Sequence, residues 1–324
     1  MYIKTGLILI GILLAILVFN FFDLSKIIAV LSTSNLYLIF LAFLVQFAII
    51  MLIGLRLWFT AYRYSCPPYV SYLETLKITI VGWTVNMLTP LTKIGGEPSK
   101  IYLYKKKGMH VSDASAIVMI DSFTDIATMY FVAILATIAM FFFGISLTIL
   151  IPFVIAIVVT LAIIASLAAV ILHPTALNKL VNWLMRKISK YKQIDIKDYA
   201  ANFQKAIKII FADRTLLKGI FSIAFLMRIL EFIRLWLIFV AIGLVLPPQI
   251  VVFAWTFLFV LAMIPWLPGG LGLMEAGGIV AFILLGIPKA IAGSAILIER
   301  ILSFWLVIAI GFIVISRMKI KIKL

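Results

Sequence analysis

The chain has 324 residues, of which 65% are hydrophobic and 12% are charged, and its mean hydropathy is +1.24. This composition excludes a soluble globular domain and predicts an all-α, polytopic membrane protein. The net charge of +16 does not indicate a nucleic-acid partner, because the basic residues form short clusters between apolar segments, as the positive-inside rule favours. The single cysteine, Cys66, excludes an intrachain disulfide and a cysteine-based metal site.

The apolar segments predict about six full transmembrane helices in one membrane domain, residues 1–324. The first of them follows Lys4 and resembles a signal peptide, but no clean cleavage site follows it, so we expect an uncleaved helix. The six predicted spans are residues 6–22, 36–59, 114–142, 145–172, 215–246 and 289–315.

Two further hydrophobic regions, residues 70–108 and 248–287, are interrupted near their middle. The first contains Pro90 and Gly95-Gly96, and the second contains the run from Pro265 to Gly270. Because proline and glycine interrupt helices, we expect each region to form a broken, re-entrant hairpin.

The distribution of lysine and arginine predicts the topology of the chain. The stretch 173–218 holds ten Lys/Arg against three Asp, and Lys105, Lys106 and Lys107 lie at the end of the first hairpin. We expect both clusters and both termini to lie in the cytoplasm, with a basic amphipathic segment at about 173–214 on the anionic leaflet. This arrangement opens the hairpin 70–108 to the cytoplasm and the hairpin 248–287 to the outside.

A sequence pattern occurs twice, with an offset of 234 − 56 = 178 residues. Arg56-Leu57-Trp58 recurs as Arg234-Leu235-Trp236, and the same offset maps Glu97 onto Glu275 and Asp121 onto Glu299. Together with the opposite hairpins, the pattern predicts an inverted repeat of residues 36–142 and 215–316. Inverted repeats with broken helices are typical of transporters.

Ionisable residues inside the apolar segments are the candidates for function. A charge near the middle of a bilayer costs at least about 2.5–3.5 kcal/mol, so it faces a cavity or a partner. Asp121 and Asp125 are four residues apart and share one helix face, and Glu231 is placed to bridge Arg228 and Arg234. Structural ion pairs and a substrate path both remain open. The candidate substrate-binding and translocation residues are Arg56, Glu97, Lys100, Asp121, Asp125, Arg228, Glu231, Arg234, Gly269, Gly270, Gly272, Glu275, Glu299 and Arg300.

Glu97 and Glu275 stand where half-helices are expected to begin after the glycine-rich breaks. Glycine permits close approach of the backbone to a ligand, and a helix N-terminus presents free N–H groups. Two roles stay open for each glutamate. It caps the free N–H groups of its half-helix, or it receives a proton or a cationic headgroup.

The residues around these breaks resemble a known family. Gly96-Glu97-Pro98-Ser99-Lys100 and the run from Pro268 to Glu275 are similar to the lysylphosphatidylglycerol synthase transmembrane-domain family, the flippase portion of the multiple-peptide-resistance factor. The resemblance covers nearly the whole chain. The chain departs from the full-length synthases in that we expect no soluble aminoacyl-transferase domain, so lysyl transfer is not expected. Family members often have arginine where this chain has Lys100, Ser122 and Met274.

These observations predict a lipid translocator of the cell membrane. Its cargo would be a phospholipid, a glycolipid or a polyprenyl-phosphate-linked lipid, and membrane lipids would be its main partners. We expect no catalytic residue, metal or other cofactor. Two alternatives remain open: a non-catalytic anchor for a separately encoded glycosyltransferase or lipid-modifying enzyme, and an integral membrane lipid transferase.

Overall fold

The computed structural model describes residues 24–64, 70–89, 95–142, 147–173, 196–263 and 268–318, and over these ranges all regular structure is helical. The predicted first span 6–22 and most of the basic segment 173–214 lie outside the described residues. The helices in chain order are α2 (Leu24–Ser32), α3 (Leu36–Tyr64), α4 (Tyr72–Leu88), α5 (Gly96–Lys106), α6 (Val111–Phe142), α7 (Leu147–Leu172), α9 (Ile196–Ala212), α10 (Arg214–Ala241), α11 (Pro248–Met263), the 3₁₀ turn η1 (Pro268–Gly270), α12 (Leu273–Leu284), α13 (Lys289–Arg300), the π turn η2 (Ile301–Trp305) and α14 (Leu306–Arg317).

Three of the described helices are long and apolar enough to cross a membrane. They are α3, α6 and the continuous helix Lys289–Arg317 formed by α13, η2 and α14. Helix α10 has 28 residues, or about 42 Å at 1.5 Å per residue, but carries three charged residues in its middle. The long helices match predicted spans to within a few residues, and the total of six spans remains a prediction.

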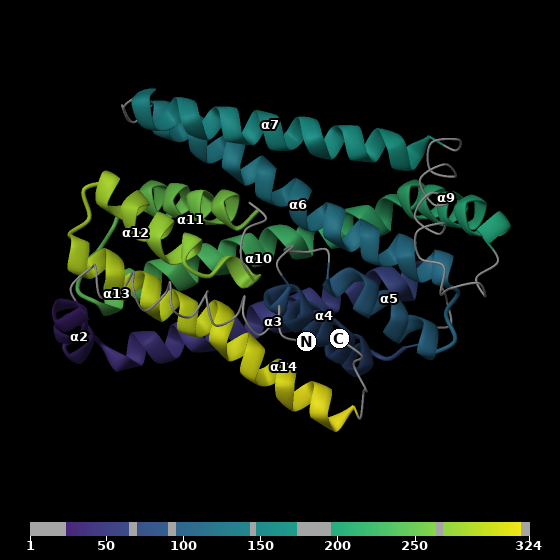
Figure 1. Ribbon diagram of the computed structural model, residues 1–324, viewed down its shortest axis with the longest axis horizontal. Coiled ribbons are helices and arrows are strands. Elements are labelled where there is room, and N and C mark those ends of the chain that lie inside the picture. Colours follow the sequence, from purple (N-terminus) through teal and green to yellow (C-terminus); the bar gives the residue numbers. More distant parts are fainter. Residues whose placement is uncertain are drawn as a thin grey trace.

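Helices α3 and α10 pack against each other in antiparallel directions (Figure 1). At one end the Asn35 N–H donates to the Ala241 carbonyl at 2.8 Å, and at the other Arg63 Nη2 lies 2.7 Å from Asp213 Oδ2. Asp213 also caps α10 by accepting from the Leu216 N–H at 2.9 Å. The Leu216 N–H, and then Arg63, hold the pKa of Asp213 below its ordinary value.

The two interrupted regions form short helix pairs at opposite ends of the molecule. Figure 1 shows α4 and α5 in its right half and α11 and α12 in its left half. Their lengths are 17, 11, 16 and 12 residues, which is below the roughly 20 residues needed to span a bilayer. A capping box of Ser71 and Glu74 begins α4. Glu74 also pairs with Lys107, which follows the last residue of α5, so the start of α4 lies next to the end of α5. Re-entrance itself remains a prediction.

Close backbone packing joins α4 to α5. The Gly96 N–H donates to Asn86 Oδ1 of α4 at 2.6 Å, so an α4 side chain caps α5. A methyl group added at Gly96 would overlap the Gly82 carbonyl oxygen and lie 2.7 Å from Asn86 Cγ. The pair can therefore approach this closely only with glycine at this position.

We expect Gly96→Ala to destabilise the protein by about 1–3 kcal/mol, because the methyl group forces α4 and α5 apart in a packed core. Chemical unfolding in detergent micelles measures this loss. Lys105→Ala is the control, since Lys105 is on the same helix and its side chain is exposed. An equal stability of the two variants would contradict this packing.

The helix Lys289–Arg317 contains one turn of π-helix directly after Arg300. Such single-turn insertions are frequent at functional sites, because they change the direction in which neighbouring side chains point. Ser303 and Phe304, which belong to this turn, line the cavity described next.

Candidate functional site

A cavity of about 470 Å³ lies between the two helix pairs. Its walls include residues of α3, α4, α5, α6, α10, α11, η1, α12, α13 and η2, and thus of both halves of the chain. Five cationic and five acidic side chains line it. They are Arg56, Lys100, Arg228, Arg234 and Arg300, and Glu97, Asp121, Asp125, Glu231 and Glu299.

Arg56 joins the two aspartates that share a face of α6. Arg56 Nε lies 2.7 Å from Asp121 Oδ1, and Arg56 Nη1 lies 3.0 Å from Asp125 Oδ1. Lys100 of α5 approaches the other oxygen of Asp121 at 3.7 Å. Arg56 and Asp121 are each 2% exposed, so the two carboxylates are stabilised by cations in place of water.

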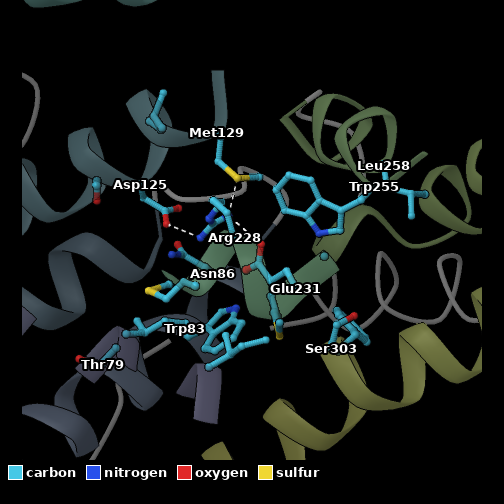
Figure 2. Close-up of a pocket in the computed structure, with 18 of the residues that line it drawn as sticks. Thr79, Trp83, Asn86, Asp125, Met129, Arg228, Glu231, Trp255, Leu258 and Ser303 are labelled. Atoms are coloured by element: carbon cyan, nitrogen blue, oxygen red, sulfur yellow. Dashed lines mark hydrogen bonds and ion pairs between the residues drawn. The ribbon is translucent and has the colours of Figure 1, made fainter. Parts of the chain in front are cut away.

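Arg228 of α10 links two carboxylates across the cavity. Its Nη2 lies 3.0 Å from Asp125 Oδ1 and its Nη1 lies 2.9 Å from Glu231 Oε2. Figure 2 shows Arg228 between Asp125 and Glu231, with Met129 and Trp255 beside it. The guanidinium carbon is 5.6 Å from the centre of the Trp255 ring, within the range of a cation–π contact. Glu231 pairs with Arg228, whereas the expected bridge to Arg234 is not made.

Arg234 pairs instead with Glu299 of α13. Arg234 Nε and Nη2 donate to the two carboxylate oxygens at 3.1 and 2.5 Å, in the bidentate arrangement that arginine favours. Arg234 also donates to the side-chain carbonyl of Gln46, which is fully buried in α3. The two pairs Arg56–Asp121 and Arg234–Glu299 are related by the offset of 178, and each spans 65 residues.

Arg300 holds the second glycine-rich break together. Arg300 Nε donates to Glu275 Oε1 at 2.6 Å, and its Nη2 donates to the Gly269 carbonyl at 3.0 Å. The other oxygen of Glu275 accepts from the Gly272 N–H at 2.7 Å. Glu275 is 2% exposed and lies behind the cavity wall. Capping, one of the two roles open for this residue, is therefore the one that the structure shows.

Glu97 has weaker contacts than Glu275. Its Oε1 accepts from Ser122 Oγ at 3.3 Å and from Asn86 Nδ2 at 3.5 Å. Its Oε2 is shielded from solvent and has no hydrogen-bond partner among the described residues. Glu97 and Asn86 both line the cavity. A buried oxygen without a donor is costly. Glu231 Oε2 also lacks a hydrogen-bond partner, but it lies 2.9 Å from Arg228, whereas no cation lies that close to Glu97 among the described residues.

The glycines of the second break mainly allow the tight turn that precedes α12, and contribute little to the cavity wall. Gly269, Gly270 and Gly272 have φ angles of 60°, 67° and 82°, in the left-handed region that glycine adopts readily. A methyl group on Gly269 would also overlap the Phe304 ring. Only Gly269 lines the cavity, while Gly270 and Gly272 shape the turn before α12.

Of the fourteen candidate residues predicted from the sequence, the structure places eleven on the cavity wall. The exceptions are Gly270, Gly272 and Glu275. Sequence reasoning missed several polar and aromatic residues that the structure brings to this wall or beside it: Gln46, Trp83, Asn86, Ser122, Trp255 and Ser303. Gln46 and Asn86 carry a signal that could have been used, because amide side chains are costly in an apolar helix without a partner. The tryptophans carry no such signal.

Comparison with known proteins is consistent with these observations. The family model described as "Lysylphosphatidylglycerol synthase TM region" matches residues 5–311. A UPF0104 membrane protein of Methanothermobacter thermautotrophicus is 26% identical over 84% of this chain and 83% of its own length. UPF0104 membrane proteins of Pyrococcus horikoshii and Methanocaldococcus jannaschii are 24% and 23% identical, and the matches cover 97% and 96% of this chain and 97% and 93% of theirs. The chain therefore belongs to the family of the lysylphosphatidylglycerol synthase transmembrane region and is a multi-pass membrane protein.

Proposed function

We propose that this protein is a lipid translocator whose cavity receives the headgroup of a membrane lipid. The observation that carries the proposal is the cavity itself, which ten charged side chains line and to which both short helix pairs contribute walls. Its volume of about 470 Å³ lies within the range of small-molecule sites. It suits a polar headgroup, while acyl chains remain in the bilayer.

The arrangement of the two helix pairs supports alternating access. The pair α4–α5 approaches the cavity from one end of the molecule and the pair α11–α12 from the other (Figure 1). The ion pairs Arg56–Asp121 and Arg234–Glu299 stand at positions related by the repeat offset. We infer two inverted halves, one of which gates the cavity to each side of the membrane.

The positive-inside rule gives the proposed orientation. Arg63 at the end of α3, and Lys105, Lys106 and Lys107 around the end of α5, belong to the end of the molecule where α9 also lies (Figure 1). We propose that this end faces the cytoplasm of the cell, with both termini on the same side. The opposite end, near Pro248 and Leu284, then faces outward.

Filling the cavity is expected to stop transport without unfolding the protein. Ser303→Trp places a large ring at the cavity wall, on the π turn. We expect the variant to lose at least about tenfold in the rate at which a fluorescent phospholipid crosses the bilayer of reconstituted vesicles, because the headgroup no longer fits. The assay follows loss of fluorescence when a membrane-impermeant quencher is added outside.

Ser316→Trp is the matched control, since Ser316 lies on the same continuous helix and is exposed near its end. This variant should transport as the wild type does. Equal rates for the wild type and Ser303→Trp, with both proteins folded, would reject the cavity as the route and favour a role without transport, such as an anchor for a partner enzyme.

A further inference from the structure

The last long helix of each repeat contacts both short helix pairs. In the second repeat this is the continuous helix Lys289–Arg317. Its first part, α13, packs against α12 of its own pair, and its last part, α14, packs against α4 of the other pair (Figure 1). In the first repeat it is α6, which packs against α5 near its start and against α11 near its end. Because packed interiors transmit displacements, a movement of one pair reaches the other through these two helices.

The helix Lys289–Arg317 is fixed closely to a helix pair at each of its ends. A methyl group added at Gly278 of α12 would lie 2.6 Å from Ile296 Cδ1 of α13. A methyl group added at Gly311 of α14 would overlap Thr84 Oγ1 of α4. A small residue therefore brings the neighbouring helix into direct contact at both ends, and the two ends follow different helix pairs.

The π turn lies between these two fixed ends. The Leu306 N–H donates to the Ile301 carbonyl, five residues earlier, so this turn holds one residue more than a regular α-helical turn. The equivalent residues of α6, 123–127, continue as ordinary α-helix. The extra residue thus belongs to the second repeat alone. A change in the hydrogen bonds around it turns α14 against α13 by up to about 100°, the angle of one helical residue.

Phe304 of the π turn packs between the two interrupted regions. Its ring is 2% exposed and lies against Gly269 of the second break. It also belongs to one apolar cluster with Leu271, which follows that break, and Leu88, which ends α4 at the first break. The guanidinium carbon of Arg300 lies 4.3 Å from the ring centre, within the range of a cation–π contact. A rotation of the π turn would move this ring out of the contact between the breaks.

We propose that the π turn is a hinge that couples the two gates, the helix pairs α4–α5 and α11–α12. When the first pair shifts, α14 follows it, the hydrogen bonds of the π turn rearrange, and Phe304 leaves Gly269. The second pair is thereby released while the first closes. This inference rests on the proposed function, because it explains how the same cavity opens to one side at a time. Helix α6, without an extra residue, is the rigid counterpart.

Deleting one residue from each long helix tests whether the π turn holds an extra residue that the fold does not need. Ile301 and Phe123 are equivalent positions, since 301 − 178 = 123, and both side chains are exposed. Deletion of Ile301 leaves a regular α-helix between α13 and α14, so we expect melting in detergent micelles within about 5 °C of the wild type. Deletion of Phe123 turns one half of α6 by about 100° against the other, and we expect melting at least about 10 °C lower. Equal losses in the two variants would overturn the proposal.

Distances across the two gates test the coupling itself. Pairs of spin labels are placed on exposed positions in a Cys66→Ser background, and the protein is reconstituted into lipid bilayers. Tyr102 of α5 with Lys205 of α9 reports on the first gate, and Leu284 of α12 with Tyr37 of α3 reports on the second. We expect two distances for each pair in the wild type and a single distance for each in the deletion variant that lacks the extra residue. A single distance at both gates of the wild type, or two distances in that deletion variant, would overturn the hinge.

The transport assay separates this inference from the proposed function. Deletion of Ile301 should lower lipid transport at least about tenfold, because the gates no longer exchange. One alanine inserted after Trp305 in the deletion variant returns the extra residue and should restore transport. Transport at the wild-type rate in the deletion variant would reject the hinge alone. Two distances at each gate of a wild-type protein that moves no lipid would reject the proposed function and support the hinge.

Discussion

Arg234→Met is expected to destabilise the folded protein by about 3–5 kcal/mol, the usual cost of removing one partner from a buried ion pair. Arg234 is 5% exposed and donates to both oxygens of Glu299. No other cation lies within 4 Å of Glu299 among the described residues. The variant therefore leaves a buried carboxylate without compensation, and Gln46 loses its donor as well. Chemical unfolding in mixed micelles measures the loss.

Arg56→Met is the comparison within the same chain, since Arg56 lies at the equivalent position 178 residues earlier. Its two carboxylates keep other cations, because Lys100 lies 3.7 Å from Asp121 and Arg228 lies 3.0 Å from Asp125. We expect a smaller loss, about 1–3 kcal/mol. A larger loss for Arg56→Met than for Arg234→Met would contradict this difference in local compensation.

The double variant Arg234→Met/Glu299→Met tests the same pair without leaving a charge behind. Replacing both partners of a buried ion pair with apolar side chains is often neutral or stabilising. We expect most of the stability lost in Arg234→Met to return. A double variant as unstable as the single one would show that the cost comes from packing and not from the uncompensated carboxylate.

Several ion pairs were predictable because a charge in an apolar helix needs a partner. Glu299 and Arg300 are adjacent and cannot face each other on a helix, so each needs a partner elsewhere. The structure pairs them with Arg234 and Glu275. Likewise, two carboxylates on one helix face need a proton or a basic group between them, and Arg56 contacts both Asp121 and Asp125.

Other features could not be predicted, because they depend on which helices meet. Glu231 was expected to bridge Arg228 and Arg234, but Arg234 turns to Glu299, which is 65 residues away in the sequence. The two glutamates at the half-helix starts looked alike in sequence. Their surroundings differ because different side chains approach them from α6 and α13. Ser122 of α6 donates a hydrogen bond to Glu97, and Arg300 of α13 donates one to Glu275.

Glu275→Gln and Glu97→Gln are expected to separate a structural role from a functional one. Glu275→Gln removes the carboxylate partner of Arg300, which is 8% exposed, and loosens the turn at Gly269 that the same arginine holds. We expect it to cost about 3–5 kcal/mol. Glu97→Gln breaks no ion pair within the described residues and changes only hydrogen bonds of 3.3 and 3.5 Å, so we expect a cost of about 1 kcal/mol or less.

The transport rates of these two variants should follow a different order from their stabilities. Glu97→Gln should lose at least about tenfold in transport although it loses little stability, because its carboxylate lines the cavity. Unfolding curves and the vesicle assay on the same preparations measure both quantities. If Glu97→Gln transports at the wild-type rate, the acid at this position does not act on the substrate. If instead neither variant affects the role of the protein in cells, an anchor for a partner enzyme explains the chain better than a translocator, because an anchor uses the helices and not the charges between them.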